Sequence, residues 1–171
     1  MPKIIDNIRE KLLMEAKKQL MEIGYSAMTI RSVAKECKVG VGTVYNYFAS
    51  KDMLVASFML EDWQECLDKI IETSNQSEDI KDVLFVVYEQ LKIFAQKYDS
   101  LFHDENAEQS QSRSSGFRHK MLRKQIAKPL KKFCKGENAE FMAEFLAENM
   151  LTWTYSNYEF EEITKILLKV L

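Results

Sequence analysis

Two short helices joined by a tight turn, with a third helix following, are predicted for residues 24–54, and no other segment restricts the fold as strongly. Thr29 is a favoured N-cap residue, because its hydroxyl can accept a hydrogen bond from an unpaired amide of the first helical turn. Apolar residues then recur at steps of three and four and predict one narrow buried face: Ile30, Val33, Ala34 and Cys37. A turn at Lys38 and Val39 leads into the second helix. This is the plan of a helix-turn-helix DNA reader.

The second helix of this motif is predicted to have a buried side and an exposed side. The inner side is apolar or aromatic: Val41, Val44, Tyr45 and Phe48. The outward side can meet a duplex: Thr43, Asn46 and Tyr47. Helices of about eight residues are marginal alone. Support is expected from residues 4–23, whose apolar residues keep an unbroken helical spacing up to a stop at Gly24. Three helices can therefore close a small core.

The segment resembles the DNA-binding domain of the tetracycline-repressor (TetR) family of bacterial transcription regulators. These residues carry the resemblance: Gly24-Tyr25, Thr29-Ile30, Val33-Ala34, Val39, Gly42 to Phe48, and Ser50 to Leu54. It covers roughly residues 5–60, about a third of the chain. The resemblance implies a homodimer whose all-helical C-terminal part binds a small-molecule effector that releases the DNA. This chain departs from the family pattern at Lys38, where glycine is usual, and at Gly40, where a serine-type cap is usual.

The resemblance also implies which side chains contact DNA. Seven positions match the family's contacts: Thr29, Arg31, Thr43, Tyr45, Asn46, Tyr47 and Lys51. The first two would touch the backbone or reach a base, while Thr43 and Asn46 would enter the major groove. Threonine can contact a thymine methyl and asparagine can pair with adenine; Tyr47 and Lys51 suit phosphate contacts. Two alternatives stay open, since Tyr45 could be a core residue and Arg31 a solvated surface charge.

Composition favours an all-helical protein. The chain of 171 residues has two prolines, five glycines and 46% hydrophobic residues, without a strand-like alternation of useful length. We expect a DNA-binding domain over residues 1–50 and a helical effector-binding and dimerisation domain over residues 51–171. The net charge of −2 is unevenly distributed along the chain, because residues 1–60 carry nine Lys and Arg against six Asp and Glu. The positively charged part is the predicted DNA-binding domain, and a positive charge favours binding to the DNA phosphates.

Other functional classes find little support in the sequence. The N-terminus has no secretory signal pattern and no apolar run is long enough to span a bilayer, so a cytoplasmic protein without membrane contact is expected. Cys37 and Cys66 are predicted to be buried free thiols, and a redox role for Cys134 stays open. His103 and His119 lack a nucleophile motif and metal-ligand spacing. We therefore predict no enzyme, no metal site and no cofactor.

Charge divides the C-terminal part sharply. The polar residues 104–116 are predicted to form a loop, a surface linker or else a gate to a pocket. Residues 117–135 carry eight basic residues and no acid, whereas residues 137–162 carry acids and no base. We favour neighbouring helices of opposite sign that lie against each other. The alternative is a second surface for nucleic acid or an anionic ligand.

The last two helices, expected at about 137–157 and 159–170, would form the dimer interface that the resemblance implies. A ligand cavity could be lined by aromatic residues and one methionine: Trp63, Phe85, Tyr88, Phe94, Tyr98, Phe102, Met121 and Trp153. Such stripes more often belong to an ordinary core. One alternative to a DNA-binding repressor remains, a helical protein-interaction adaptor built on a helix-turn-helix scaffold without specific DNA binding.

Overall fold

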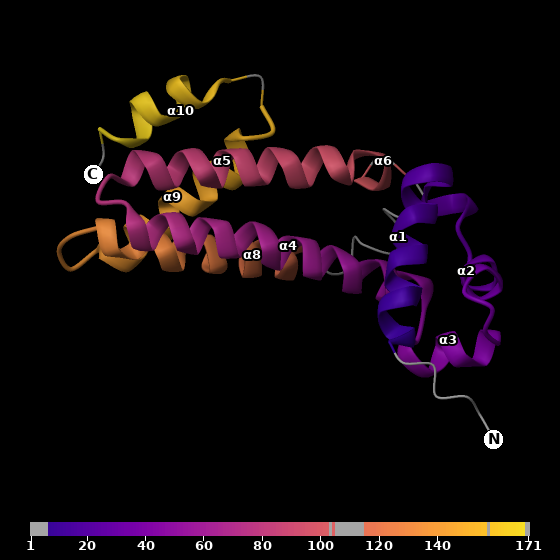
Figure 1. Cartoon of the computed structure of the whole chain (residues 1–171). Helices are drawn as coiled ribbons and strands as arrows, with labels where there is room; N and C mark the ends of the chain where they lie inside the picture. The colour runs from indigo at the N-terminus through magenta and orange to yellow at the C-terminus, as the bar shows by residue number, and fades with distance from the viewer. Residues whose placement is uncertain (1–6, 103, 105–114, 157, 170–171) are drawn as a thin grey trace. The chain divides into compact units, whose positions relative to one another are not determined.

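The computed structural model describes residues 7–102, 104, 115–156 and 158–169, and within these ranges the regular structure is entirely helical (Figure 1). The helices are α1 (Ile8–Ala27), α2 (Ile30–Glu36), α3 (Val41–Tyr47), α4 (Lys51–Gln76), α5 (Ile80–Lys97), α6 (Asp99–Phe102), α8 (Ser115–Leu130), the 3-10 helix η2 (Lys131–Phe133), α9 (Ala139–Trp153) and α10 (Phe160–Leu167). The predicted all-α fold class is confirmed.

The chain forms two compact units. The first unit comprises the described residues within 1–62 and 98–113, and the second comprises those within 63–97 and 114–171. The long helix α4 thus contributes its first half to one unit and its second half to the other. Our expected boundary at residue 50 lies where α4 begins, whereas the compact units divide within that helix.

In the first unit, α1 supports the α2–α3 pair. The predicted stop at Gly24 is present, since this residue has a φ of 80° and interrupts the helical geometry of α1. Ile23, expected on the apolar face, is exposed because it precedes that break. The core of the unit is built from α1, α2, α3 and the start of α4: Leu12, Ala16, Leu20, Met28, Val33, Val44, Phe48, Leu54 and Phe58. This packing stabilises two helices that are too short to persist alone.

The turn between α2 and α3 has a strained backbone at Lys38, where the family usually has glycine. Lys38 has a φ of 56°, in the left-handed region that glycine adopts most readily. We therefore expect Lys38→Gly to stabilise the first unit by up to about 1 kcal/mol, because it relieves the steric cost of the side chain at this turn. Chemical denaturation measures the change. Glu36→Gly, at the last residue of α2, where φ is not positive, is the matched control and should not raise stability, because glycine there only adds conformational freedom to the unfolded chain. A destabilised Lys38→Gly variant would contradict the strain.

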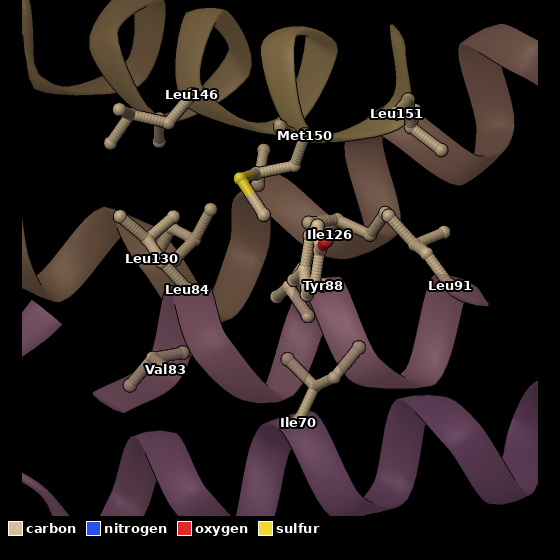
Figure 2. Close-up of a cluster of buried hydrophobic side chains, with 14 of the residues drawn as sticks. Ile70, Val83, Leu84, Tyr88, Leu91, Ile126, Leu130, Leu146, Met150 and Leu151 are labelled. Atoms are coloured by element: carbon tan, nitrogen blue, oxygen red, sulfur yellow. The ribbon is translucent and has the colours of Figure 1, made fainter. Parts of the chain in front are cut away.

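The second unit has a core shared by all of its helices. Side chains from α4, α5, α8 and α9 meet around Ile70, Leu84, Ile126 and Met150 (Figure 2). Phe160 brings α10 onto α5 through edge-to-face packing with Phe85 at 5.1 Å between ring centroids. The helices of this unit thus pack on several sides, as wide apolar stripes along a helix require.

The charged helices of the second unit lie against each other. Arg123 on α8 makes ion pairs with Glu144 and Glu148 on α9, at 3.3 and 3.4 Å. Lys131 pairs with Glu140 at 2.7 Å. The favoured interpretation of the opposite charges is therefore confirmed, although the exposed Lys131–Glu140 pair contributes little free energy.

The predicted helix ends differ modestly from the observed ones. The basic helix ends at Leu130 and tightens into η2, one residue after Pro129, whose ring and missing amide disfavour regular α-helix. The last two helices are shorter than expected. Of the predicted loop at 104–116, residues 105–114 lie outside the described ranges, and residues 115 and 116 already belong to α8.

Candidate DNA-reading site

Helix α3 presents a row of uncharged polar and aromatic side chains to solvent. Val44 is fully buried below this row, and Phe48 closes the end of the helix against the core. Asn46 is exposed, Thr43 is half-buried at the first turn, and Tyr47 is 47% exposed. Tyr45, expected on the inner side, is instead 53% exposed. Because α3 is only seven residues long, Val44 alone fills its contact with the core, and the neighbouring tyrosine is left outside.

The N-terminus of α2 is fixed by a capping box. The Thr29 hydroxyl accepts from the Ser32 amide at 3.0 Å, and the Ser32 hydroxyl oxygen accepts from the Thr29 amide at 3.0 Å. The Ser32 hydroxyl in turn donates to Gln19 Oε1 on α1 at 2.6 Å. The predicted cap is confirmed, while the tie to Gln19 was not foreseen. Arg31 is exposed beside the cap.

Lys51, at the first turn of α4, is partly exposed to solvent and also contacts α1. Its ammonium donates to the Tyr25 carbonyl oxygen and lies 3.9 Å from the centre of the Tyr25 ring. The Tyr25 hydroxyl donates to Asp52 on the same turn of α4. Burial lowers the pKa of Lys51, and the carboxylates of Asp104 and Asp52 act in the opposite direction. No residue near Lys51 in the sequence indicates this second role, because Tyr25 is distant from it along the chain.

The eight residues proposed for a ligand cavity belong to both compact units. Trp63 and Phe94 pack edge to face at 5.7 Å in the second unit, and Tyr88 and Phe85 both pack on Phe160. Met121 is on α8, while Tyr98 and Phe102 belong to the first unit. Trp153 lines a groove of its own. Helical periodicity indicated that these side chains lie on apolar faces, but it did not indicate which helix each of them packs against.

The groove at Trp153 lies between α9 and α10 and has a volume of about 590 Å³. Its lining combines apolar and charged residues: Asn149, Trp153, Tyr158, Glu162, Ile163, Lys165, Ile166, Leu167 and Lys169. Along α9, the exposed aromatic residues Phe141 and Phe145 continue the line of Asn149 and Trp153 at steps of four. These residues form one stripe on α9, which we call the α9 stripe.

Other predicted features have a plain structural account. Cys66 and Cys134 are buried, whereas Cys37 is half-buried at the end of α2, where its thiol donates to the Lys11 carbonyl. Burial raises the pKa of the Cys37 and Cys134 thiols. His119 contacts Glu148 at 2.8 Å, and His103 lies outside the described residues. Among the residues that the structure describes, no helix is both long and apolar enough for a bilayer crossing.

Comparison with known proteins places this geometry in a family. Residues 12–58 match the bacterial regulatory proteins of the tetR family. The transcriptional regulator HbdR of Aromatoleum is 32% identical over 74 residues, which are 42% of this chain and 32% of HbdR. The matched segment thus spans about a third of that curated relative.

Solved structures extend the likeness beyond the first unit. The TetR-family repressor AlkX of Dietzia is 14% identical with a TM-score of 0.67, covering 95% of this chain and 92% of that one. Thermus thermophilus FadR, a TetR-family repressor solved with lauroyl-CoA, is 18% identical with a TM-score of 0.65 over the same shares. At these identities the likeness concerns the fold alone.

The fold and the exposed face of α3 define a helix-turn-helix protein of the DNA-binding class. The matched segment contains the whole α2–α3 motif. This part of the chain is therefore similar to the bacterial regulatory proteins of the tetR family.

Proposed function

We propose that this chain is a DNA-binding transcriptional regulator, a homodimeric repressor that binds a palindromic operator in the bacterial cytoplasm and is released by a small-molecule effector. The observation that carries the proposal is the exposed face of α3, where Asn46 and Tyr47 extend from a helix anchored by Val44. Short polar side chains on such a helix can reach base edges in the major groove. Thr29, Arg31 and Lys51 flank this face at helix starts and suit contacts with phosphates.

The proposed dimer forms through α9 and α10 of each copy. Phe141 and Ile166 are 68% and 67% exposed, and the groove beside Ile166 is open. Exposed apolar stripes of this extent mark association surfaces. A two-fold interface places the same stripe on both partners, and the two α3 helices would then read two half-sites of a palindrome.

Release by an effector is supported by the match of residues 12–58 to the tetR family and by the example of Thermus FadR, a repressor solved with lauroyl-CoA. For such a ligand in this chain we propose the aromatic residues that pack in the second unit. Trp63 and Phe94 pack against each other there, and both belonged to the predicted ligand set.

The proposal is tested by selecting bound duplexes from a random library with the wild-type chain at about 0.15 M ionic strength, where surface charges are screened within roughly 8 Å. We expect a palindrome whose half-site centres lie about one helical turn, roughly 34–36 Å, or a multiple of that apart. Failure to enrich any duplex would refute specific DNA binding and favour the interaction-adaptor alternative.

A further inference from the structure

One glutamine is buried on the side of α1 that supports α2. Gln19 is only 7% exposed, and its neighbours on the same side of α1 are apolar: Leu12, Ala16 and Leu20. A buried amide costs free energy unless its oxygen and its nitrogen are both hydrogen-bonded. Both are bonded here, since Gln19 Nε2 donates to Glu15 Oε1 at 2.7 Å and Gln19 Oε1 accepts from the Ser32 hydroxyl at 2.6 Å. The side chain thus links α1 to the first turn of α2.

The directions of these hydrogen bonds are fixed by their chemistry. A carboxylate can only accept, so Glu15 draws the amide nitrogen of Gln19 toward itself and leaves the amide oxygen facing Ser32. An amide oxygen can only accept in turn, so the Ser32 hydroxyl donates its one proton to Gln19. The hydroxyl oxygen is then available to accept from the Thr29 amide, which is one half of the capping box.

Without Gln19, the Ser32 proton would have another acceptor within reach. The Thr29 carbonyl oxygen lies 2.8 Å from the Ser32 hydroxyl, and it already accepts from the Val33 amide at 3.1 Å in the first helical bond of α2. A serine hydroxyl that donates to such a carbonyl competes with the helical bond and loosens the turn. Because α2 has only seven residues, its first turn is a large part of the helix. Gln19 keeps the proton away from this carbonyl oxygen.

We propose that Gln19, held in orientation by Glu15, is a positioning residue for DNA binding. It fixes the Ser32 hydroxyl and with it the first turn of α2, from which Thr29 and Arg31 extend into solvent. The inference rests on the proposed function, in which those two residues contact the duplex. Gln19 is buried and cannot contact DNA itself, so its effect on binding must pass through Ser32.

The first test removes the two ends of the Gln19–Ser32 bond. Gln19→Leu fills the buried site with a side chain of similar size, and we expect it to weaken binding of the selected duplex by about three- to tenfold, as the loss of one hydrogen bond would, with unchanged helix content. Ser32→Ala should weaken binding by a similar factor. Because the two residues act in series, the double variant should bind no more weakly than either single variant. Gln90→Leu on α5 is the matched control, since it replaces an equally buried glutamine of the second unit and should bind as the wild type does.

Glu15 supplies a second and independent pair of variants. Both Glu15→Gln and Glu15→Leu remove a negative charge, and this change alone would raise the affinity for DNA phosphates. Glu15→Gln keeps an acceptor for the Gln19 amide nitrogen and should bind at least as tightly as the wild type. Glu15→Leu allows the amide to turn over, so we expect it to bind about three- to tenfold more weakly than Glu15→Gln. This pair decides the matter if Gln19→Leu lowers the helix content.

The anisotropy of a labelled duplex measures all of these affinities. Wild-type affinity in Gln19→Leu overturns the positioning role, and so does an equal loss in Gln90→Leu. Losses from Gln19→Leu and Ser32→Ala that multiply in the double variant, or equal affinities of the two Glu15 variants, also overturn it. A wild-type chain that binds no duplex removes the proposed function, and with it the role of Gln19. Wild-type binding together with unaffected variants removes the role of Gln19 alone.

Discussion

Replacing Asn46 and Tyr47 together by alanine is expected to lower operator affinity about 100-fold or more while leaving the fold unchanged. Each base or phosphate contact of this kind contributes roughly 1–3 kcal/mol, so two lost contacts reach that size. Both side chains are exposed on α3, and the core below them depends on Val44 and Phe48, which stay in place. The measurement is titration of a labelled selected duplex, with circular dichroism as the check on folding.

Salt dependence sharpens this prediction. Neither side chain is charged, so the slope of log affinity against log salt should equal that of the wild type even though affinity falls. The control is the double variant Met14→Ala and Met21→Ala, which removes two exposed side chains from α1 and should bind normally. Wild-type affinity in the Asn46 and Tyr47 variant would contradict the assignment of α3 as the reading helix. Loss of helix content would instead show that these residues are structural.

Local signals in the sequence predicted the helix-turn-helix well. The cap at Thr29 and the stop at Gly24 each depend on neighbours within four residues, and both are present. The opposite charges of the helices α8 and α9 were also interpreted correctly. Among its charged residues, the segment of α8 carries only basic ones and the segment of α9 only acidic ones. The two segments follow each other directly in the sequence, so each is the nearest partner of opposite charge for the other.

Contacts between residues far apart in the sequence could not be predicted. Nothing near Lys51 indicates that its ammonium binds the Tyr25 carbonyl, and nothing near Tyr98 indicates that its hydroxyl meets Asp62. Helical periodicity indicates on which face of its own helix a side chain lies, but not which other helix that face packs against. For that reason the aromatic ligand set mixed residues of both units. Tyr45 was a candidate DNA contact but was also expected on the inner side of α3, and only that second expectation fails. A seven-residue helix offers too few positions to distinguish the flank from the centre of its buried face.

The contact between Lys51 and Tyr25 changes how a role of Lys51 in DNA binding should be tested. Alanine at this position would remove a contact with Tyr25 together with any phosphate contact, so loss of binding would have two explanations. Tyr47 has no such second role among the described contacts beyond packing beside Phe48 at 6.4 Å. The uncharged pair Asn46 and Tyr47 is therefore the cleaner probe of the reading face.

Charge placed on the α9 stripe and on α10 is expected to break the dimer and, with it, operator binding. Phe141→Glu combined with Ile166→Glu should give a particle of 20.0 kDa in place of one twice that mass, measured by light scattering after size exclusion. Two unpaired carboxylates buried in an interface cost several kcal/mol each. The monomer should stay folded, because both side chains are more than 60% exposed in it.

The effect on DNA follows from linkage between the two half-sites. A dimer that has bound one half-site finds the second at high effective concentration, which raises affinity by about 10²–10⁴ over a single reader. The monomeric variant should lose this factor and still bind weakly. Leu60→Glu with Ile93→Glu adds the same charge at exposed apolar positions on α4 and α5, and should remain dimeric and bind normally. If the Phe141 and Ile166 variant stays dimeric, α9 and α10 are not the interface. If it becomes monomeric and binds the operator with undiminished affinity, a single DNA-binding unit is enough for binding and the palindrome has no role.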